Sequence, residues 1–157
     1  MSDIFPGRYT AKLDKPLVLF LIGARINKIL AFREIAWFAS TMPKMLKELQ
    51  AKPDAGMLWY RQYVSPPVIL VQQYWRSFDR LLAYAHDKDG HHFPMWAKFN
   101  KRLANNPAIG IWHETYLVEP GKFECIYGHM PLFGLAAASD HVKAEGRLAA
   151  AKDRFAA

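Results

Sequence analysis

One uninterrupted apolar stretch, residues 17–24, limits the folds that this sequence can adopt. A helix that crosses a membrane needs about 20 apolar residues, and this stretch is far shorter, with Arg25 and Lys28 directly beyond it. Strands in a sheet covered on both faces have this continuous apolar character. The stretch therefore predicts a buried strand over residues 16–26 and no membrane span.

Helices and strands are expected to alternate after this strand. Apolar residues recur at helical spacing, and Asn27 and Ser77 are suitable N-caps. The helices expected on this basis cover residues 28–40, 78–85 and 94–104. Pro43 interrupts the first pattern and can begin a further helix at its own first turn. Strand-forming residues predict strands over residues 57–64, 68–75, 108–118 and 122–130, the last two forming a hairpin.

The expected order, strand-helix-strand-strand-helix-strand-strand, is the split βαβ arrangement of ferredoxin-like α+β folds with an extra hairpin strand. Helices on one face of such an antiparallel sheet leave its other face to be covered. Because the strands are apolar on both sides, we expect a second copy to cover that face in a homodimer. The expected domain, residues 16–135, lies between an N-terminal arm, residues 1–15, and an alanine-rich tail, residues 136–157, that is either mobile or helical from Asp140.

Cysteine content and charge exclude several classes of protein. Cys125 is the single cysteine, so no intrachain disulfide can form, which favours a reducing, cytoplasmic setting. The net charge is +7, but the basic residues are scattered, so they are expected to solvate helix faces or attract an anionic ligand rather than bind nucleic acid. Walker loops, dinucleotide-binding glycine motifs, cysteine pairs and nucleophile elbows do not occur in the sequence. Their absence from the sequence disfavours P-loop NTPases, Rossmann NAD enzymes, cysteine-ligated zinc proteins and α/β-hydrolases.

Four segments rich in rare residue types carry a family resemblance. They are Gln73-Tyr74-Trp75-Arg76-Ser77-Phe78, His91-His92-Phe93-Pro94-Met95-Trp96 with Phe99 and Asn100, Gly110-Ile111-Trp112-His113-Glu114-Thr115-Tyr116, and Tyr127-Gly128-His129-Met130-Pro131-Leu132-Phe133-Gly134-Leu135. Through them the chain resembles the antibiotic-biosynthesis monooxygenase superfamily, in the branch named after the fungal polyketide monooxygenase of fumagillin biosynthesis. The family favours Asn at the position of His129 and Pro at the position of Leu132.

The resemblance implies a dimeric α+β barrel and an oxygenase-like role on small organic molecules. The superfamily includes cofactor-free oxygenases, heme enzymes and proteins with no known reaction, so the resemblance leaves the cofactor open. If residue 129 touches the substrate, His129 implies a substrate or chemistry that differs from that of its relatives.

His113, Glu114 and Arg76 are the candidates for catalysis. His113 and Glu114 are neighbours on an expected strand, so they point to opposite faces and only one can line a given pocket. His113 can be a general base on an acidic carbon or phenol, a heme ligand, or a core histidine with a satisfied hydrogen bond. Glu114 can be a general base or an ion-pair partner of Arg76. Arg76 can instead hold an anionic group of the substrate or pair with Asp79.

A second set of residues is expected to bind the substrate. Aromatic residues on adjacent strands can line a dry pocket that protects a carbanion or radical, although such clusters more often form core. The expected set is Tyr74, Trp75, Trp112, Tyr116, Tyr127, His129, Met130 and Phe133. If a heme is bound, His113 or His129 is its expected axial ligand, and no other metal is expected.

The leading hypothesis is a small monooxygenase that acts on an apolar or aromatic, polyketide-type molecule. A heme-binding protein or heme-dependent enzyme of the same fold is the first alternative. A non-enzymatic protein that binds a small ligand is the second.

Overall fold

The computed structural model describes residues 3–87, 92–104 and 106–155. Its helices and strands, in chain order, are β1 (Phe5–Lys12), β2 (Leu17–Ile26), α1 (Phe32–Ala51), β3 (Met57–Ser65), β4 (Val68–Trp75), α2 (Phe78–Ala85), α3 (His92–Leu103), β5 (Ile109–Val118), β6 (Tyr127–Met130), α4 (Leu135–Ala138), β7 (Asp140–Lys143) and α5 (Ala151–Phe155). Short 3-10 turns lie at Pro53–Ala55 and Gly146–Leu148. No helix within the described ranges has the length and apolar character needed to cross a membrane.

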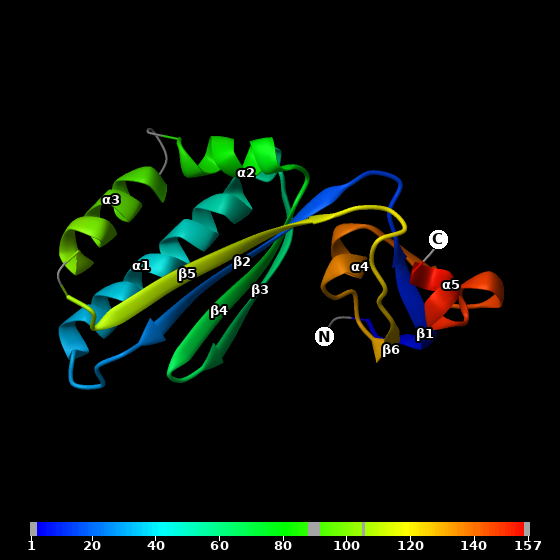
Figure 1. Ribbon diagram of the computed structural model, residues 1–157, viewed down its shortest axis with the longest axis horizontal. Coiled ribbons are helices and arrows are strands. Elements are labelled where there is room, and N and C mark those ends of the chain that lie inside the picture. Colours follow the sequence, from blue (N-terminus) through cyan, green and yellow to red (C-terminus); the bar gives the residue numbers. More distant parts are fainter. Residues whose placement is uncertain (1–2, 88–91, 105, 156–157) are drawn as a thin grey trace.

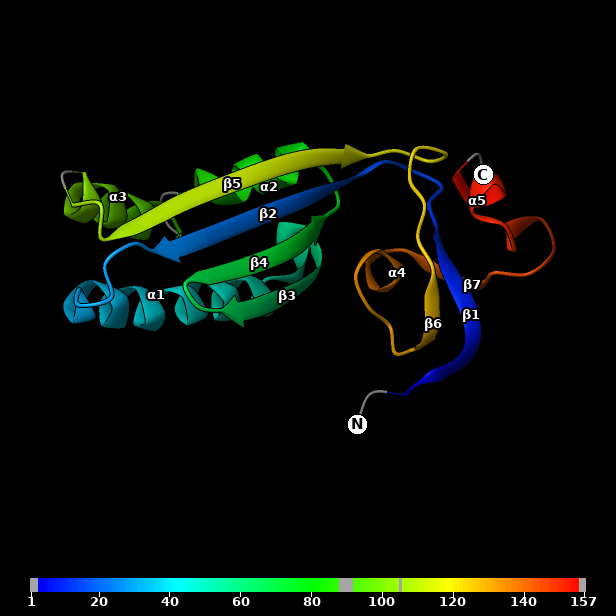
Figure 2. The ribbon, with the colours of Figure 1, turned by 60° about the horizontal axis from the view of Figure 1, so that its bottom comes forward.

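Four strands form the larger, antiparallel sheet, in the order β3-β4-β2-β5 (Figures 1 and 2). β2 and β3, which α1 connects, have β4 between them. β4 and β5, which α2 and α3 connect, enclose β2 in the same way. This is the split βαβ topology of ferredoxin-like folds, so the α+β class predicted from the sequence is confirmed.

Helices α1, α2 and α3 cover one face of this sheet. Val18 and Trp75, which lie opposite each other on β2 and β4, are buried against Leu49 of α1 and Leu81 of α2. Side chains alternate between faces along a strand, so Leu19 and its neighbours across the sheet point away from the helices. We call the side that carries Leu19 the open face.

Three further strands form a second sheet, in the order β6-β1-β7. The expected hairpin between residues 108–118 and 122–130 is wrong, because β6 pairs with β1 instead. Two hydrogen bonds from β1 hold Cys125, just before β6, beside β1. The Cys125 carbonyl accepts one from the Thr10 hydroxyl (2.8 Å), and its sulfur accepts the other from the Ala11 N–H (3.4 Å). The N-terminal arm is therefore largely the strand β1.

The C-terminal tail is folded rather than a single exposed helix. Its first residues form α4, β7 pairs with β1, and Gly146, with a φ of +56°, turns the chain before α5. Arg154 is 6% exposed and holds this end in place. Its guanidinium donates to the carboxylate of Glu124 and to the carbonyl of Leu148 (2.9 Å). Such a buried charge needs a partner, and Glu124 supplies it from the segment between β5 and β6.

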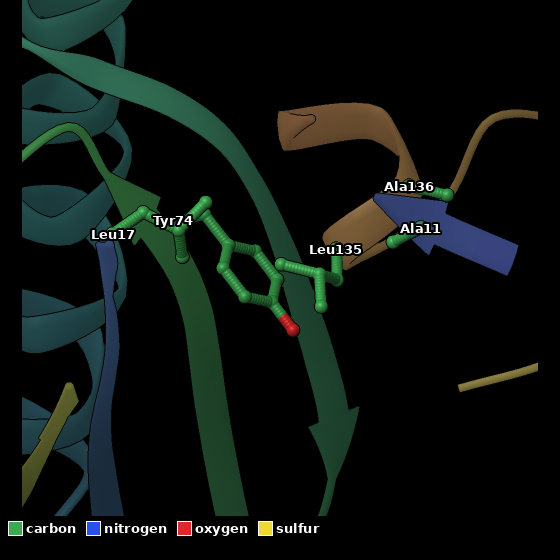
Figure 3. Close-up of a cluster of buried hydrophobic side chains, with 5 residues drawn as sticks. All are labelled: Ala11, Leu17, Tyr74, Leu135 and Ala136. Atoms are coloured by element: carbon green, nitrogen blue, oxygen red, sulfur yellow. The ribbon is translucent and has the colours of Figure 1, made fainter. Parts of the chain in front are cut away.

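The two sheets meet in one hydrophobic cluster (Figure 3). Leu17 and Tyr74 come from the open face of the larger sheet, Ala11 comes from β1, and Leu135 and Ala136 come from α4. Figure 3 shows the Tyr74 ring directed toward Leu135. The smaller sheet and α4 therefore cover one end of the open face and leave the rest of it uncovered.

The first helix differs from the one that the sequence predicts, both in where it begins and in its course through Pro43. The first helix begins at Phe32 rather than at Lys28, because the Asn27 side chain is engaged elsewhere: it accepts from Arg25 (2.6 Å) and donates to the Pro107 carbonyl (3.0 Å). α1 also runs through Pro43 as one helix. Ser77 is the N-cap of α2 as predicted, since its hydroxyl accepts from the Arg80 N–H (3.3 Å).

Candidate functional site

The predicted site residues of β5 divide between the two faces of the larger sheet. His113 lies opposite Ile22 of β2, and Thr115 lies opposite Phe20. Phe20 packs against the core beneath the helices, so His113 and Thr115 are on the helix side. Trp112, Glu114 and Tyr116 therefore lie on the open face.

His113 is an exposed imidazole on the edge strand of the sheet. Its ring lies 5.7 Å from the ring of Phe20, measured between centroids. Across the ranges that the structure describes, no group forms a hydrogen bond or ion pair with the His113 side chain. It is thus not a core histidine with a satisfied hydrogen bond, and both of its ring nitrogens are available to a small molecule.

Glu114 is engaged with a residue of its own strand. The Tyr116 hydroxyl donates a hydrogen bond of 2.6 Å to the Glu114 carboxylate. That hydrogen bond raises the pKa of Tyr116 above its usual value, because it stabilises the neutral phenol. Glu114 and His113 point away from each other, so they do not act on the same substrate atom.

Trp112 lies flat across Gly23 on the open face. A Cβ atom placed on Gly23 would meet atoms of the Trp112 indole ring at 2.5–2.7 Å, so only a glycine leaves room for the ring. The indole is 37% exposed even in this position. Gly23 therefore fixes where the largest side chain of β5 lies.

Gly23→Ala is expected to lower the free energy of unfolding by about 1–3 kcal/mol, the usual cost of overpacking. Gly110→Ala is the matched control, since its Cβ would meet only Asn27 Nδ2, at 3.4 Å. Urea unfolding of both variants measures the difference. The loss should largely disappear when Gly23→Ala is combined with Trp112→Ala, and a loss of equal size in both backgrounds would exclude the indole as its cause.

Tyr74 and Trp75 are neighbours on β4 that point to opposite faces. Tyr74 lies on the open face at the end of a hydrogen-bonded chain: the Tyr63 hydroxyl donates to Gln72 (3.0 Å), and the Gln72 amide donates to the Tyr74 oxygen (3.2 Å). Burial raises the pKa of Tyr74, and the bond from Gln72 lowers it in part. Trp75 is fully buried on the helix side, where its Nε1–H donates to Gln73 (2.8 Å).

The expected aromatic set is therefore not one pocket lining. Tyr74, Trp112 and Tyr116 share the open face, and Trp75 belongs to the core on the helix side. Tyr127 lies in the second sheet and packs in the same cluster as Tyr74. Adjacent sequence positions on a strand cannot line one cavity.

Arg76 is exposed beyond the end of β4. Its backbone N–H donates to the Gly56 carbonyl (2.8 Å), and within the described part of the chain its side chain pairs with neither Glu114 nor Asp79. Trp75, the residue before it, lies opposite Val18, whereas His113 lies opposite Ile22. That offset of four residues is about 13 Å along the strands. The structure does not bring Arg76 and His113 together around one small group.

The last family segment, residues 127–135, fastens the second sheet to the first. The Tyr127 hydroxyl accepts from the Ala136 N–H (3.3 Å), and burial raises its pKa strongly. Phe133 packs edge-on against Trp59 of β3, with ring centroids 5.1 Å apart. Met130 lies opposite Phe5 of β1. These residues hold elements together, a role that their spacing alone does not reveal.

His129 has an unusual backbone conformation. Its φ is +52°, in the left-handed region where Asn and His are enriched among residues other than glycine. Its Nδ1 accepts a hydrogen bond from the Gly7 N–H (3.4 Å) across an irregular pairing of β1 with β6. The backbone at this position therefore suits His129, and it would equally suit the Asn that the resemblance leads us to expect.

Heme is the cofactor that the resemblance leaves open, and the two candidate ligands allow its fit to be tested. A metal-binding histidine usually donates its second ring N–H to a carboxylate, carbonyl or water, and no described residue accepts such a bond from His113. His129 accepts a hydrogen bond from the Gly7 N–H at Nδ1. Neither histidine therefore has, among the described residues, the partner that usually orients an axial ligand.

Other metal sites are not apparent among the described residues, where no three or more His, Cys, Asp or Glu side chains gather.

The sequence alone does not identify the residue that flanks His113, which is Phe20 of β2. The alternation along the apolar stretch predicts which residues share a face, but only the register identifies the neighbours of His113.

His141 of β7 lies in an aromatic cluster of the second sheet. Its ring stacks on Tyr9 (4.3 Å between centroids) and meets Phe5 edge-on (4.8 Å). Burial lowers the pKa of His141. The folded chain therefore takes up this proton less readily than the unfolded chain, in which a histidine has a pKa of about 6.5.

The stability that His141 contributes is present above about pH 6.5 and is lost as the pH falls below that value. The midpoint of thermal unfolding should drop between about pH 7.5 and 5, and His141→Phe should reduce that drop. His86→Phe is the control, since His86 is exposed. An equal drop in the wild type and in His141→Phe would contradict this origin.

The fold and the segments just described define a small ferredoxin-like α+β protein. Residues 17–135 match the model of the Monooxygenase af470-like family, and the chain belongs to that family. The match confirms the resemblance inferred from the sequence, and it supports an enzyme of monooxygenase-like type that acts on small molecules. Residue 91, in the second of the four segments, lies outside the described residues.

Solved structures share the fold at low sequence identity. The chain is similar to an aldoxime dehydratase in complex with butyraldoxime, with 14% identity and a TM-score of 0.59 over 73% of this chain and 34% of that one. It thus spans about a third of the dehydratase. An antibiotic biosynthesis monooxygenase (13% identity, TM-score 0.45, 64% of this chain and 96% of that one) is also similar. Rv0793 from Mycobacterium tuberculosis is similar too, with 14% identity and a TM-score of 0.47 over 65% of this chain and 97% of that one. None of the curated proteins matches the chain.

Proposed function

We propose that the chain is a small monooxygenase that needs no cofactor and acts on an apolar or aromatic molecule of polyketide type. The substrate lies on the helix side of the larger sheet, and His113 is the general base. The observation that carries the proposal is that His113 is exposed and has no hydrogen-bond partner among the described residues, in a chain that belongs to a monooxygenase-like family.

The surroundings of His113 favour a substrate of this kind. Phe20 and Ile22, both half-buried on β2, present apolar surface beside the imidazole. Apolar surface of this type binds aromatic rings, and it favours a delocalised anion over a localised one. A phenol, or a methylene group activated by neighbouring carbonyls, is therefore a suitable group for His113 to deprotonate.

The reaction balances without an external reductant: R–CH2–R′ and O2 give R–CO–R′ and water. His113 removes a proton from the activated carbon, and the resulting carbanion supplies the electrons that form the new C–O bond. The O–O bond then breaks, one oxygen atom stays as the carbonyl and the other leaves as water with both protons. The role of the protein is to hold the substrate, remove the proton and return it.

Oxygen uptake tests the proposal. The purified protein is mixed with a panel of naphthols, anthrones and aromatic 1,3-dicarbonyl compounds under ¹⁸O2. Mass spectrometry then measures the molecular masses of the products. The expected result is turnover without added reductant, with one ¹⁸O atom in the product. Saturable binding of these compounds with no oxygen uptake would favour a non-enzymatic binding protein instead.

A hemin titration separates this proposal from its heme alternative. Because neither His113 nor His129 has the surroundings of an axial ligand, added hemin should give no stoichiometric Soret band. A saturable band at one heme per chain, lost in His113→Ala but not in His129→Asn, would overturn the cofactor-free proposal.

A further inference from the structure

The turn between β2 and α1 carries large apolar side chains at its tip. A backbone hydrogen bond of 3.1 Å joins its two ends, so residues 28–31 form a β-turn with Ile29 and Leu30 at the two central positions. Polar residues, glycine and proline usually occupy such positions. Leu30 is 82%, Ile29 78% and Phe32, the first residue of α1, 67% exposed. They are the three most exposed of the large apolar residues that the structure describes.

Hydrogen bonds to the segment after α3 hold this turn in place. The backbone N–H groups of Asn27 and Lys28 both donate to the Ala108 carbonyl (2.9 and 3.3 Å), and the Asn27 side chain donates to the Pro107 carbonyl (3.0 Å). Figures 1 and 2 show the turn at the end of the molecule opposite the second sheet. The apolar tip is therefore a fixed projection from the surface, and no described element covers it.

Basic side chains flank the tip on both sides. Arg25, Lys28 and Arg33 are all exposed, and residues 25–33 contain no acidic side chain. The Arg25 guanidinium donates to the Asn27 side chain (2.6 Å). None of the three basic groups forms an ion pair with a residue that the structure describes. Their charges are therefore available to an anionic partner.

An apolar tip between basic side chains matches the surface of an anionic bilayer, which is negatively charged at the headgroups and apolar beneath them. A protein partner fits less well, because a stable protein interface buries roughly 800 Å² on each side and three projecting side chains offer much less. The net charge of +7 acts in the same direction as the tip, since it attracts the whole chain to an anionic surface.

We propose that this turn docks on the surface of an anionic lipid bilayer. Ile29, Leu30 and Phe32 enter the boundary between headgroups and acyl chains, while the basic side chains around them lie at the lipid phosphates. Lysine and arginine suit this position, because their apolar stems lie along apolar surface while the charge stays in water. The contact is peripheral and reversible, and it inserts no helix.

This contact does not depend on the proposed function. Ile22, which lies opposite His113, is four residues from Ile26, the last residue of β2, or about 13 Å along the strand. Docking at the turn beyond Ile26 thus leaves the surroundings of His113 free.

Flotation of the whole chain with lipid vesicles tests the proposal. One set of vesicles is an equimolar mixture of phosphatidylcholine and phosphatidylglycerol, and the other is phosphatidylcholine alone. The chain should float with the anionic vesicles and bind the neutral ones at least about tenfold more weakly, because anionic lipid attracts each Lys and Arg near the surface. Added salt should weaken the binding to anionic vesicles. A wild-type protein that stays unbound at low salt would overturn the proposal.

Two pairs of substitutions separate the apolar tip from the rest of the surface. Ile29→Ser with Leu30→Ser should lower the partition coefficient for anionic vesicles at least about tenfold, because two apolar side chains no longer enter the bilayer. Ile4→Ser with Phe155→Ser is the matched control, since these residues are 65% and 56% exposed at the other end of the molecule. Thermal unfolding verifies that each variant is folded. Equal losses in the two pairs would overturn the assignment of the turn.

The charges are tested in the same way. Lys28→Gln with Arg33→Gln should lower binding to anionic vesicles at least about tenfold and change binding to neutral vesicles little. Lys15→Gln with Lys152→Gln removes two exposed charges beside the second sheet and should have a smaller effect. If both pairs weaken binding equally, net charge rather than this turn carries the attraction, and the proposal fails.

A fluorescent label tests directly which part of the chain enters the bilayer. In a Cys125→Ser background, Leu30→Cys or Ile4→Cys is labelled with a nitrobenzoxadiazole dye. Anionic vesicles should shift the emission of the Leu30→Cys label to shorter wavelength, brominated lipids should quench it, and the Ile4→Cys label should not respond. If the emission of the Leu30→Cys label is already shifted without vesicles and changes with protein concentration, the tip contacts protein rather than lipid, and the proposal is overturned.

Discussion

Trp75→Ala is expected to lower the free energy of unfolding by about 3–5 kcal/mol, the usual cost of removing a buried aromatic side chain. Trp75 is 0% exposed and lies at the centre of the cluster that joins the larger sheet to α1 and α2. Its ring packs 5.6 Å from that of Tyr84, and its N–H donates to Gln73. The substitution leaves a cavity and also an amide oxygen without its donor.

Urea unfolding measures this loss, with Trp96→Ala as the matched control. Trp96 is 56% exposed on α3, so its removal should cost less than about 1 kcal/mol. If Trp75 lined the substrate site, its removal would raise KM while the protein stayed stable. Similar stability losses for the two tryptophans would contradict the position of Trp75 in the core.

His113→Gln is expected to lower kcat/KM at least about 100-fold, within the usual range for the loss of a general base. Glutamine can accept a hydrogen bond, but it does not take up a proton near neutral pH. His113 is exposed and forms no hydrogen bond with a described residue, so stability should change little. The loss should therefore be one of catalysis with the fold intact.

Oxygen-uptake kinetics on the best substrate of the panel measures this effect. His86→Gln is the matched control, since His86 is exposed at the end of α2 and its Nδ1 lies 3.0 Å from the Leu82 carbonyl. The control should retain wild-type kcat/KM and His113→Gln should not. Unchanged turnover in His113→Gln would remove His113 from the mechanism.

Local patterns predict most of the larger sheet. The apolar stretch that becomes β2 and the N-cap at Ser77 are each signals within a few residues of the element they define. The split βαβ order follows from these elements alone. The second sheet does not, because its pairing joins β1 to β6 and β7 across more than a hundred residues.

The candidate site is harder to read from the sequence for the same reason. Alternation places His113 and Glu114 on opposite faces, and that much follows from their adjacency. Which face the helices cover depends on how Trp75 and Val18 pack, and the neighbours of His113 and Glu114 depend on the register of β5 against β2. A shift of one residue in any pair would move those side chains to the other face.

In the function that we propose, a small aromatic molecule binds on the helix side of the sheet, beside His113. Trp112 and His113 are adjacent residues on opposite faces, so their side chains report on the two faces separately. We would record ¹H–¹⁵N spectra of the labelled protein, resolving indole N–H and imidazole nitrogen signals, while adding 2-naphthol. A substrate site beside His113 predicts a saturable shift of the His113 ring nitrogens, with the Trp112 indole signal unmoved. A saturable shift of the Trp112 indole with His113 unmoved would contradict it.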